Sequence, residues 1–200
     1  MGYMYPINER KIPESDLAVF TILGHNKDKY PGRGLVEVYG SGLKITNGDL
    51  ALRANFATIK NNKIVDRRVG RTLKTSEAKR LARAINWKVK IGYKFKFKST
   101  VQHRGVLVVR GGFSDNITNT DPQYAKNQGN KLPDCLPLDD EELTKVSANV
   151  VNSFINQSRR ILSNHAVNKK RRKNGELEAN IILTRGAGTE LYELNQMSDW

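Results

Sequence analysis

The chain is poor in the residue types that form disulfides and metal centres. Its 200 residues include one cysteine, Cys135, and three histidines, His25, His103 and His165. A single cysteine excludes an internal disulfide and suits a reducing compartment. The acidic residues near Cys135 disfavour a thiolate, so we interpret this thiol as inert. The histidines lack the spacing of metal ligands, so these residues alone do not predict a complete metal site.

Long apolar runs are also missing. No stretch approaches the roughly 18 residues that a transmembrane helix needs, and residues 1–10 lack the apolar core of a signal peptide. We therefore expect no membrane partner and a cytoplasmic location. A hydrophobic content of 38% and a charged content of 27% fit a soluble globular protein. The length allows one large domain, or one domain and part of a second.

Acidic residues are scarce relative to basic ones. The chain has 34 Lys and Arg against 20 Asp and Glu, for a net charge of +14. This excess favours either a nucleic-acid partner or an anionic substrate drawn into a basic cleft. The run Lys169–Lys173 has no interleaved aromatic residue, which is typical of a solvated helix end or loop. Position therefore distinguishes the two interpretations better than the total charge does.

Two segments, Leu52–Arg71 and His103–Pro122, carry the most informative arginines. Each places Arg, Asn, Asp or His side chains at the ends of short apolar strands, beside glycines. The guanidinium group offers a fixed fork of donors to phosphate and carboxylate. A surface ion-pair network is the alternative, but it would stabilise the fold little. The pattern predicts a site for a phosphorylated acid.

Periodicity predicts an α/β protein. A short helix begins at Ser15 or Asp16 and ends near Gly24, and the turn at residues 47–49 suggests a domain boundary. Two buried strands end in Arg followed by Gly, and ligands bind beyond such strand ends in α/β folds. The expected strands are 50–59, its hairpin partner 63–67, 93–98, 106–109 and 180–184. The expected helices are 75–87 and 139–162, the second opening on a capping box of Asp139 and Glu142 and burying Leu143.

Several motifs together resemble one known family. They are Glu14-Ser15-Asp16 with Ile22-Leu23-Gly24, Gly32-Arg33-Gly34, 48–58, Asp66-Arg67-Arg68 with Gly70-Arg71, His103-Arg104, Ser114-Asp115, Thr120-Asp121-Pro122, His165 with Asn168, Ala179-Asn180 and 185–188. In order and spacing the chain is similar to the archaeal-type cofactor-independent phosphoglycerate mutases, metalloenzymes of the alkaline phosphatase superfamily. The resemblance covers nearly the whole chain.

The resemblance implies a domain organisation and an activity. Residues 1–48 would be part of a phosphatase-like domain, 49–188 an inserted substrate-binding domain with a mixed sheet and flanking helices, and 189–200 a return segment. The implied reaction interconverts 3-phosphoglycerate and 2-phosphoglycerate, in glycolysis and gluconeogenesis. Ser15 would be the catalytic nucleophile that forms a phosphoserine, and also a metal ligand. Two divalent metal ions, Mn²⁺ or Mg²⁺ with Zn²⁺ as a third candidate, would assist, and no 2,3-bisphosphoglycerate would be needed.

Ten further residues match the family's substrate-binding motifs. The implied set is Arg53, Asn55, Asp66, Arg67, Arg71, His103, Arg104, Asp115, Asp121 and Arg185. The family's opening Asp-Gly metal motif and its later Asp and His ligands are absent from the sequence. We therefore expect a fragment with little or no mutase activity by itself, because the metal ligands other than Ser15 are missing.

Two alternatives remain open at this stage. One is a basic nucleic-acid-binding module that uses Lys94, Lys96, Lys98 and Lys169–Lys173, although we do not expect nucleic acid as a partner. The other is a different member of the same superfamily that handles another phosphoryl or phosphonate compound. The sequence does not determine the oligomeric state, the metal identity or the role of each arginine.

Overall fold

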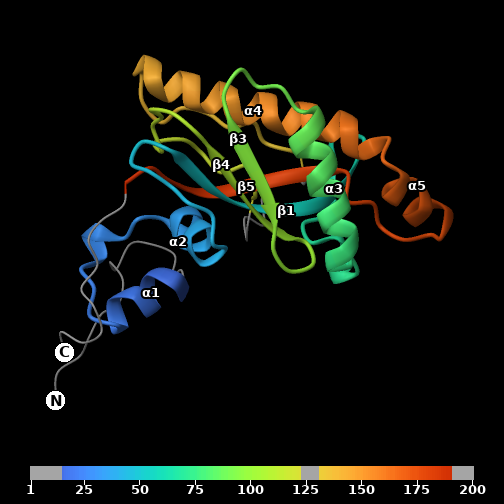
Figure 1. The fold of residues 1–200 in the computed structure, drawn as a ribbon, viewed down its shortest axis with the longest axis horizontal. Coiled ribbons are helices and arrows are strands. Elements are labelled where there is room, and N and C mark those ends of the chain that lie inside the picture. Colours follow the sequence, from blue (N-terminus) through green and yellow to red (C-terminus); the bar gives the residue numbers. More distant parts are fainter. Residues whose placement is uncertain (1–14, 123–130, 191–200) are drawn as a thin grey trace.

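A computed structural model describes residues 15–122 and 131–190 of the chain (Figure 1). Most of the expected return segment (191–200) and the first 14 residues of the expected phosphatase-like domain lie outside this described part. Within it, the helices are α1 (Ser15–Ile22), α2 (Arg33–Gly40), α3 (Thr75–Lys88), α4 (Glu142–Ser163) and α5 (Ala166–Lys173), with short 3-10 turns η1 (Lys27–Lys29) and η2 (Val69–Arg71). The strands are β1 (Leu50–Lys60), β2 (Lys63–Asp66), β3 (Phe95–Ser99), β4 (Arg104–Val109) and β5 (Ile181–Gly188).

The sheet is organised around β1. This strand pairs with β4 along one edge and with β5 along the other, over largely the same residues. The C-terminal end of β1 pairs with β2, and β3 lies beyond β4. Every one of these pairings is antiparallel, so the sheet is not the mixed one that we expected, although the α/β class is confirmed. The hairpin from β1 to β2 turns through Asn61 and Asn62, both with positive φ, as two-residue hairpin turns favour.

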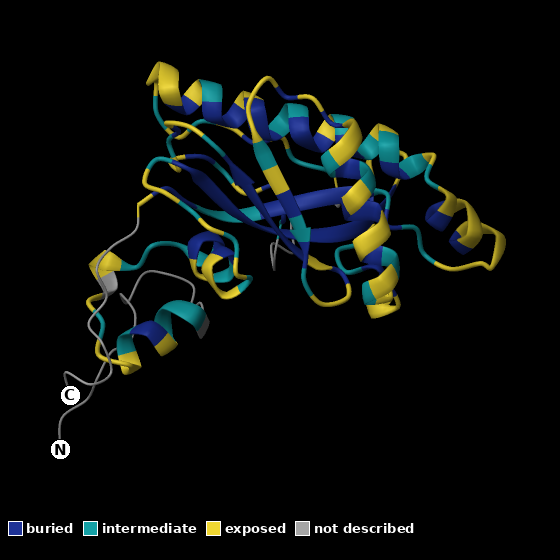
Figure 2. Ribbon diagram, in the orientation of Figure 1, coloured by how far each residue is buried: buried dark blue, intermediate teal, exposed yellow. Residues whose placement is uncertain are grey.

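One face of the sheet is covered by α3 and α4 (Figures 1 and 2). Alternate residues of β1, among them Leu52 and Phe56, point to this side and join the main core, as strand geometry requires. The Phe97 ring contacts the rings of Phe56 and Phe154 there. Burial of this apolar face is the main source of stability.

The other face receives α2. Leu35 and Val38 of α2 pack on Ala51, Val106 and Val108 in a second, smaller apolar cluster. This helix lies very close to the strands. The close contact requires glycine both in the helix and in the neighbouring strand β5. The α1 helix lies beyond α2, away from the sheet (Figure 1). The proposed boundary at residues 48 and 49 stays a prediction.

Most expected elements are confirmed, but the start of the longest helix is not. α4 begins at Glu142 with Glu141 as its N-cap, and no side chain caps it. The Asp139 carboxylate instead accepts hydrogen bonds from the Asn116 side chain and the Glu141 backbone. Leu143 is 46% exposed rather than buried. The helix therefore starts later than the capping pattern predicted.

Candidate functional site

Five polar side chains meet on the face of the sheet that α2 only partly covers. We call this group the arginine face; it consists of Arg53 and Asn55 from β1, Arg67 after β2, Asp121, and Arg185 from β5. Arg53 and Arg185 are direct register partners across β1 and β5, so their side chains emerge side by side on the same face. Arginines that are far apart in sequence are thus brought together by strand pairing.

Asp121 is the buried centre of this group. Its side chain has no exposed surface, and its Oδ1 lies 2.5 Å from Arg67 Nε. Its Oδ2 accepts from Asn55 Nδ2 at 3.2 Å and lies 3.9 Å from Arg185 Nε. One carboxylate therefore orients side chains from β1, β5 and the loop after β2. It neutralises only part of their positive charge.

Arg53 is held from the opposite side by Glu37. The Arg53 side chain is 7% exposed, and its Nη1 lies 2.6 Å from Glu37 Oε1. Burial lowers the pKa of Arg53 to about 10, Glu37 opposes this shift, and the neighbouring Arg185, Arg33 and Arg104 add to it. Arg53 nevertheless stays protonated at neutral pH. The surplus of guanidinium groups makes this face attractive to an anion.

Four buried polar atoms near this face have no hydrogen-bond partner among the described residues. They are Arg53 Nε, Arg185 Nε, Asn55 Oδ1 and His103 Nδ1. Buried polar groups are almost always satisfied in native proteins, because leaving one unpaired costs about 1–3 kcal/mol. Two unsatisfied guanidinium donors on neighbouring strands therefore indicate a site that a ligand completes.

His103 lies just before β4 and is 5% exposed. Burial lowers its pKa to about 4, and the charges of Arg104, Arg68, Arg53 and Arg71 act in the same direction. The imidazole is consequently neutral at physiological pH. A neutral imidazole both donates and accepts a hydrogen bond, which suits a hydroxyl group of a ligand better than a second anion.

The loop after β2 is strained. Val69, Gly70 and Arg71 all have positive φ, and for a β-branched residue such as Val69 this conformation is a genuine outlier. The Asp66 carboxylate stabilises the loop by accepting from the backbone of Arg68 and Gly70. One carboxylate oxygen of Asp66, which we expected to bind substrate, thus stabilises its own turn, and its role in binding stays a prediction. Strain of this kind concentrates at binding sites.

The remaining predicted residues lie at the margin or away from the arginine face. Arg104 is exposed at the start of β4, opposite Asn55, and lines a cavity of about 360 Å³. Arg71 is exposed in the strained loop. Asp115 is exposed, and its neighbour Ser114 bonds to α4 residues rather than to the arginine face. Ser15 is the first residue of α1; its side chain lies outside the described part.

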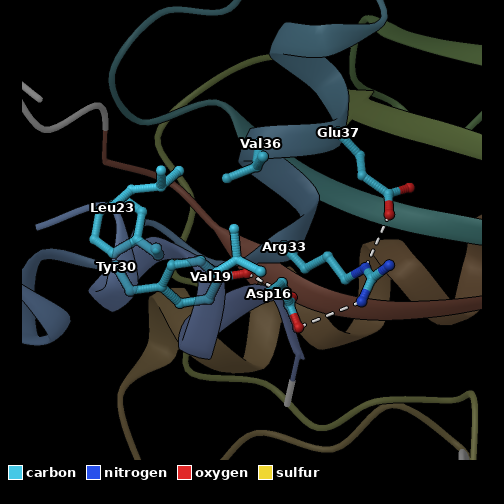
Figure 3. Close-up of a pocket in the computed structure, with 8 residues that line it drawn as sticks. Asp16, Val19, Leu23, Tyr30, Arg33, Val36 and Glu37 are labelled. Carbon is cyan, nitrogen blue, oxygen red and sulfur yellow. Dashed lines mark hydrogen bonds and ion pairs between the residues drawn. The ribbon is translucent and has the colours of Figure 1, made fainter. Parts of the chain in front are cut away.

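Sequence reasoning missed the group that joins α1 to the arginine face. A cavity of about 410 Å³ lies between α1 and α2, and its lining includes Asp16, Tyr30, Arg33 and Glu37 (Figure 3). The spacing of Arg33 and Glu37, four residues apart, was the available signal, since such residues share one face of a helix. Their shared face was not evident from the sequence, because no helix was expected over residues 33–40.

The basic run in α5 is less available than its sequence indicates. Arg171 is 1% exposed and bonds to Glu77 and Thr72, and Arg172 pairs with Glu178. The second predicted basic set, Lys94, Lys96 and Lys98, is not fully available either. The Lys98 ammonium donates a hydrogen bond to a backbone carbonyl at the C-terminal end of α2. These contacts weaken the case for a continuous nucleic-acid surface.

Cys135 is a buried free thiol. Burial, with help from Asp134, raises the pKa of the Cys135 thiol to about 12, which supports the interpretation of this thiol as inert. The described residues include no cluster of three His, Cys, Asp or Glu side chains that could hold a metal ion. Among those same residues, none of the helices has the length and apolarity needed to cross a membrane.

Comparison with known proteins identifies the family of the chain. The family model for 2,3-bisphosphoglycerate-independent phosphoglycerate mutase matches residues 1–168. The chain is 39% identical over 205 residues to the mutase of that name from Methanopyrus kandleri, covering 100% of this chain and 48% of the relative. It is 45% identical over 191 residues to the one from Methanosphaera stadtmanae, covering 94% and 46%.

A solved structure gives the same result. The fold is similar to the cofactor-independent phosphoglycerate mutase from Thermoplasma acidophilum, with a TM-score of 0.71 and 43% identity, covering 89% of this chain and 47% of that one. The chain thus spans about half the length of the curated relatives it matches. From the family match, the sequence identity and the shared fold, we conclude that this chain belongs to the 2,3-bisphosphoglycerate-independent phosphoglycerate mutases.

Proposed function

We propose that the chain is part of an enzyme that interconverts 3-phosphoglycerate and 2-phosphoglycerate, with Ser15 carrying the phosphoryl group between the two hydroxyls. The observation that carries this proposal is the pair of buried Nε donors on Arg53 and Arg185, which lack an acceptor among the described residues. They lie on register partners of adjacent strands. A three-carbon acid with a carboxylate and a phosphate supplies the acceptors that such donors need.

The other members of the arginine face have supporting roles in this proposal. Asp121 orients Arg67 and Asn55, and neutral His103 is suited to a hydroxyl group of the glycerate. The glycerate stays bound between the two halves of the reaction. If it escaped into solvent, water would take the phosphoryl group instead, and the enzyme would act only as a phosphatase. The catalytic and substrate-binding assignments made from the sequence stay predictions, and among them Asp66 and Asp115 have the least structural support.

The metal ions belong to the proposal for the intact protein. We expect two divalent ions there, Mn²⁺ or Mg²⁺ with Zn²⁺ as a third candidate. The described residues of this chain do not form such a centre by themselves, since no three His, Cys, Asp or Glu side chains cluster among them. We therefore assign no step to a metal. A cytoplasmic location and a role in glycolysis or gluconeogenesis are part of the same proposal.

An assay of the intact protein that contains this chain tests the reaction. 3-Phosphoglycerate is supplied with Mn²⁺, and the 2-phosphoglycerate that forms is consumed by enolase. Ser15→Ala should abolish turnover, because the phosphoryl acceptor is lost. Ser76→Ala is the matched control, since Ser76 is exposed on α3, and it should keep full activity. A wild-type protein that forms no product would overturn the proposal.

The same assay tests the arginine face. Arg53→Ala should raise the KM for 3-phosphoglycerate roughly 10- to 150-fold, because a lost hydrogen bond to a charged group costs about 1.5–3 kcal/mol. Arg83→Ala, an exposed arginine on α3, should leave the KM unchanged. Equal effects of the two substitutions on the KM would show that Arg53 acts only through the overall positive charge of the protein and not through a specific contact.

A further inference from the structure

An alternating chain of charges joins the start of α1 to the arginine face. Asp16 Oδ1 lies 3.3 Å from Arg33 Nη1, and Arg33 Nε donates to Glu37 Oε1 at 2.8 Å. The same oxygen of Glu37 accepts from Arg53 Nη1 at 2.6 Å. Figure 3 shows the first two of these contacts on the wall of the cavity between α1 and α2. The two ends of this chain are the residue after Ser15 and a central residue of β1.

The central members are held firmly. Arg33 and Glu37 lie four residues apart on α2, so they share a helix face. The backbone of α2 lies directly against the sheet, since a Cβ at Gly34 would lie 2.5 Å from the carbonyl oxygens of Ala51 and Gly186. Although burial lowers the pKa of Arg33, the hydrogen bond to Glu37 and the charge of Asp16 raise it overall. Arg33 is therefore charged at physiological pH and is carried by a helix that packs closely on the sheet.

Among the described residues, the α1 helix has few apolar attachments, chiefly the buried Phe20, whose ring contacts His25 and Tyr30. It lies outside the two apolar clusters that hold the sheet, beyond α2 (Figure 1). Val19 and Ile22 of α1 are 53% and 62% exposed. The polar contacts of Asp16 with Arg33 and Tyr30 are consequently important for where this helix begins. The position of Ser15 relative to Arg53 then depends on Arg33.

We propose that Arg33 is a positioning residue, which couples the helix start that carries Ser15 to Arg53 through Asp16 and Glu37. This inference rests on the proposed function, since it concerns transfer between Ser15 and a substrate on the arginine face. Replacing Arg33 leaves the pairs Glu37–Arg53 and Arg67–Asp121 in place. Substrate affinity is then retained, whereas phosphoryl transfer slows, because a displacement of about 1 Å can cost about 100-fold in rate.

The kinetic test uses Arg33→Met in the intact protein. The kcat for 3-phosphoglycerate should fall roughly 10- to 100-fold, while the Kd measured by calorimetry should change less than about 3-fold. The matched control is Arg172→Met, which breaks the distant pair with Glu178 and should leave both constants unchanged. A parallel loss of rate and affinity, or no loss of either, overturns the inference.

A second readout does not depend on turnover. Inorganic phosphate is used as the probe, and amide hydrogen exchange is followed in wild-type protein and in Arg33→Met. Phosphate should slow exchange in both β1 and α1 of the wild type, but only in β1 of Arg33→Met. Equal protection of α1 in the two proteins overturns the coupling. A wild-type protein that shows this coupling but no mutase turnover would refute the proposed reaction alone.

Discussion

Replacement of Asp121 by Asn gives the sharpest test of how the arginine face is held together. The substitution keeps the size of the side chain but removes its charge. The Asp121 side chain has no exposed surface, lies 2.5 Å from Arg67 and is 3.9 Å from Arg185. Without it, two guanidinium groups lose their shared buried counter-ion. Breaking a buried pair in this way costs about 3–5 kcal/mol.

This cost is large enough to measure by thermal unfolding. A chain of this size loses about 2–4 °C in Tm for each kcal/mol, so Asp121→Asn should lower the Tm by about 6–20 °C. Inorganic phosphate should restore more of the Tm in the variant than it adds to the wild type, because the variant carries one more uncompensated positive charge. Calorimetry or circular dichroism, with and without phosphate, measures both effects.

Asp115→Asn is the matched control. Asp115 is exposed in the loop after β4, so this substitution should change the free energy of unfolding by less than about 0.5 kcal/mol. A loss below about 1 kcal/mol for Asp121→Asn would refute the reasoning, since that value belongs to a solvated surface pair. A phosphate effect equal in wild type and variant would show that Asp121 does not balance the charge of the face.

Two further predictions concern packing and pH. Gly34→Ala should lower the free energy of unfolding in urea by at least about 3 kcal/mol, because its Cβ would lie 2.5 Å from two carbonyl oxygens. The control Gly40→Ala, which has open space around it, should change the free energy of unfolding by no more than about 1 kcal/mol. Similar losses in the two variants would exclude close packing as the cause. His103, with its pKa lowered to about 4, binds a proton more readily in the unfolded chain. The free energy of unfolding should therefore fall by about 3 kcal/mol as the pH drops from about 6.5 to about 4. His103→Gln should lack this pH-dependent loss of stability. An identical pH profile in the variant and the wild type would contradict the reasoning.

Local signals predicted the secondary structure well where the pattern was strong. The alternation in 50–59 and the helical spacing of Ala78, Leu81 and Ile85 correspond to β1 and α3. The start of α4 was predicted wrongly, because Asp139 finds a partner 23 residues away in Asn116. A capping pattern in the sequence cannot show that a distant side chain competes for the capping carboxylate. Contacts of this kind depend on the fold, so only coordinates reveal them.

The candidate site was predicted in part for a similar reason. The sequence singled out Arg53, Arg67, Asp121 and Arg185 by motif, and the structure places all four together. It did not indicate Glu37, although this carboxylate bonds directly to Arg53. The pairing arises between a helix and a strand that are separated by a loop, and no period in the sequence encodes it.

The order of residues by itself determined the family, most of the elements and the surplus of arginine, because these follow from composition, periodicity and motif spacing. The tertiary structure alone decided which charges meet. Strand pairing sets Arg53 beside Arg185, and the close approach of α2, which needs glycine at position 34, brings Glu37 to Arg53. Electrostatic interactions depend on distance and burial, and both exist only once the chain has folded.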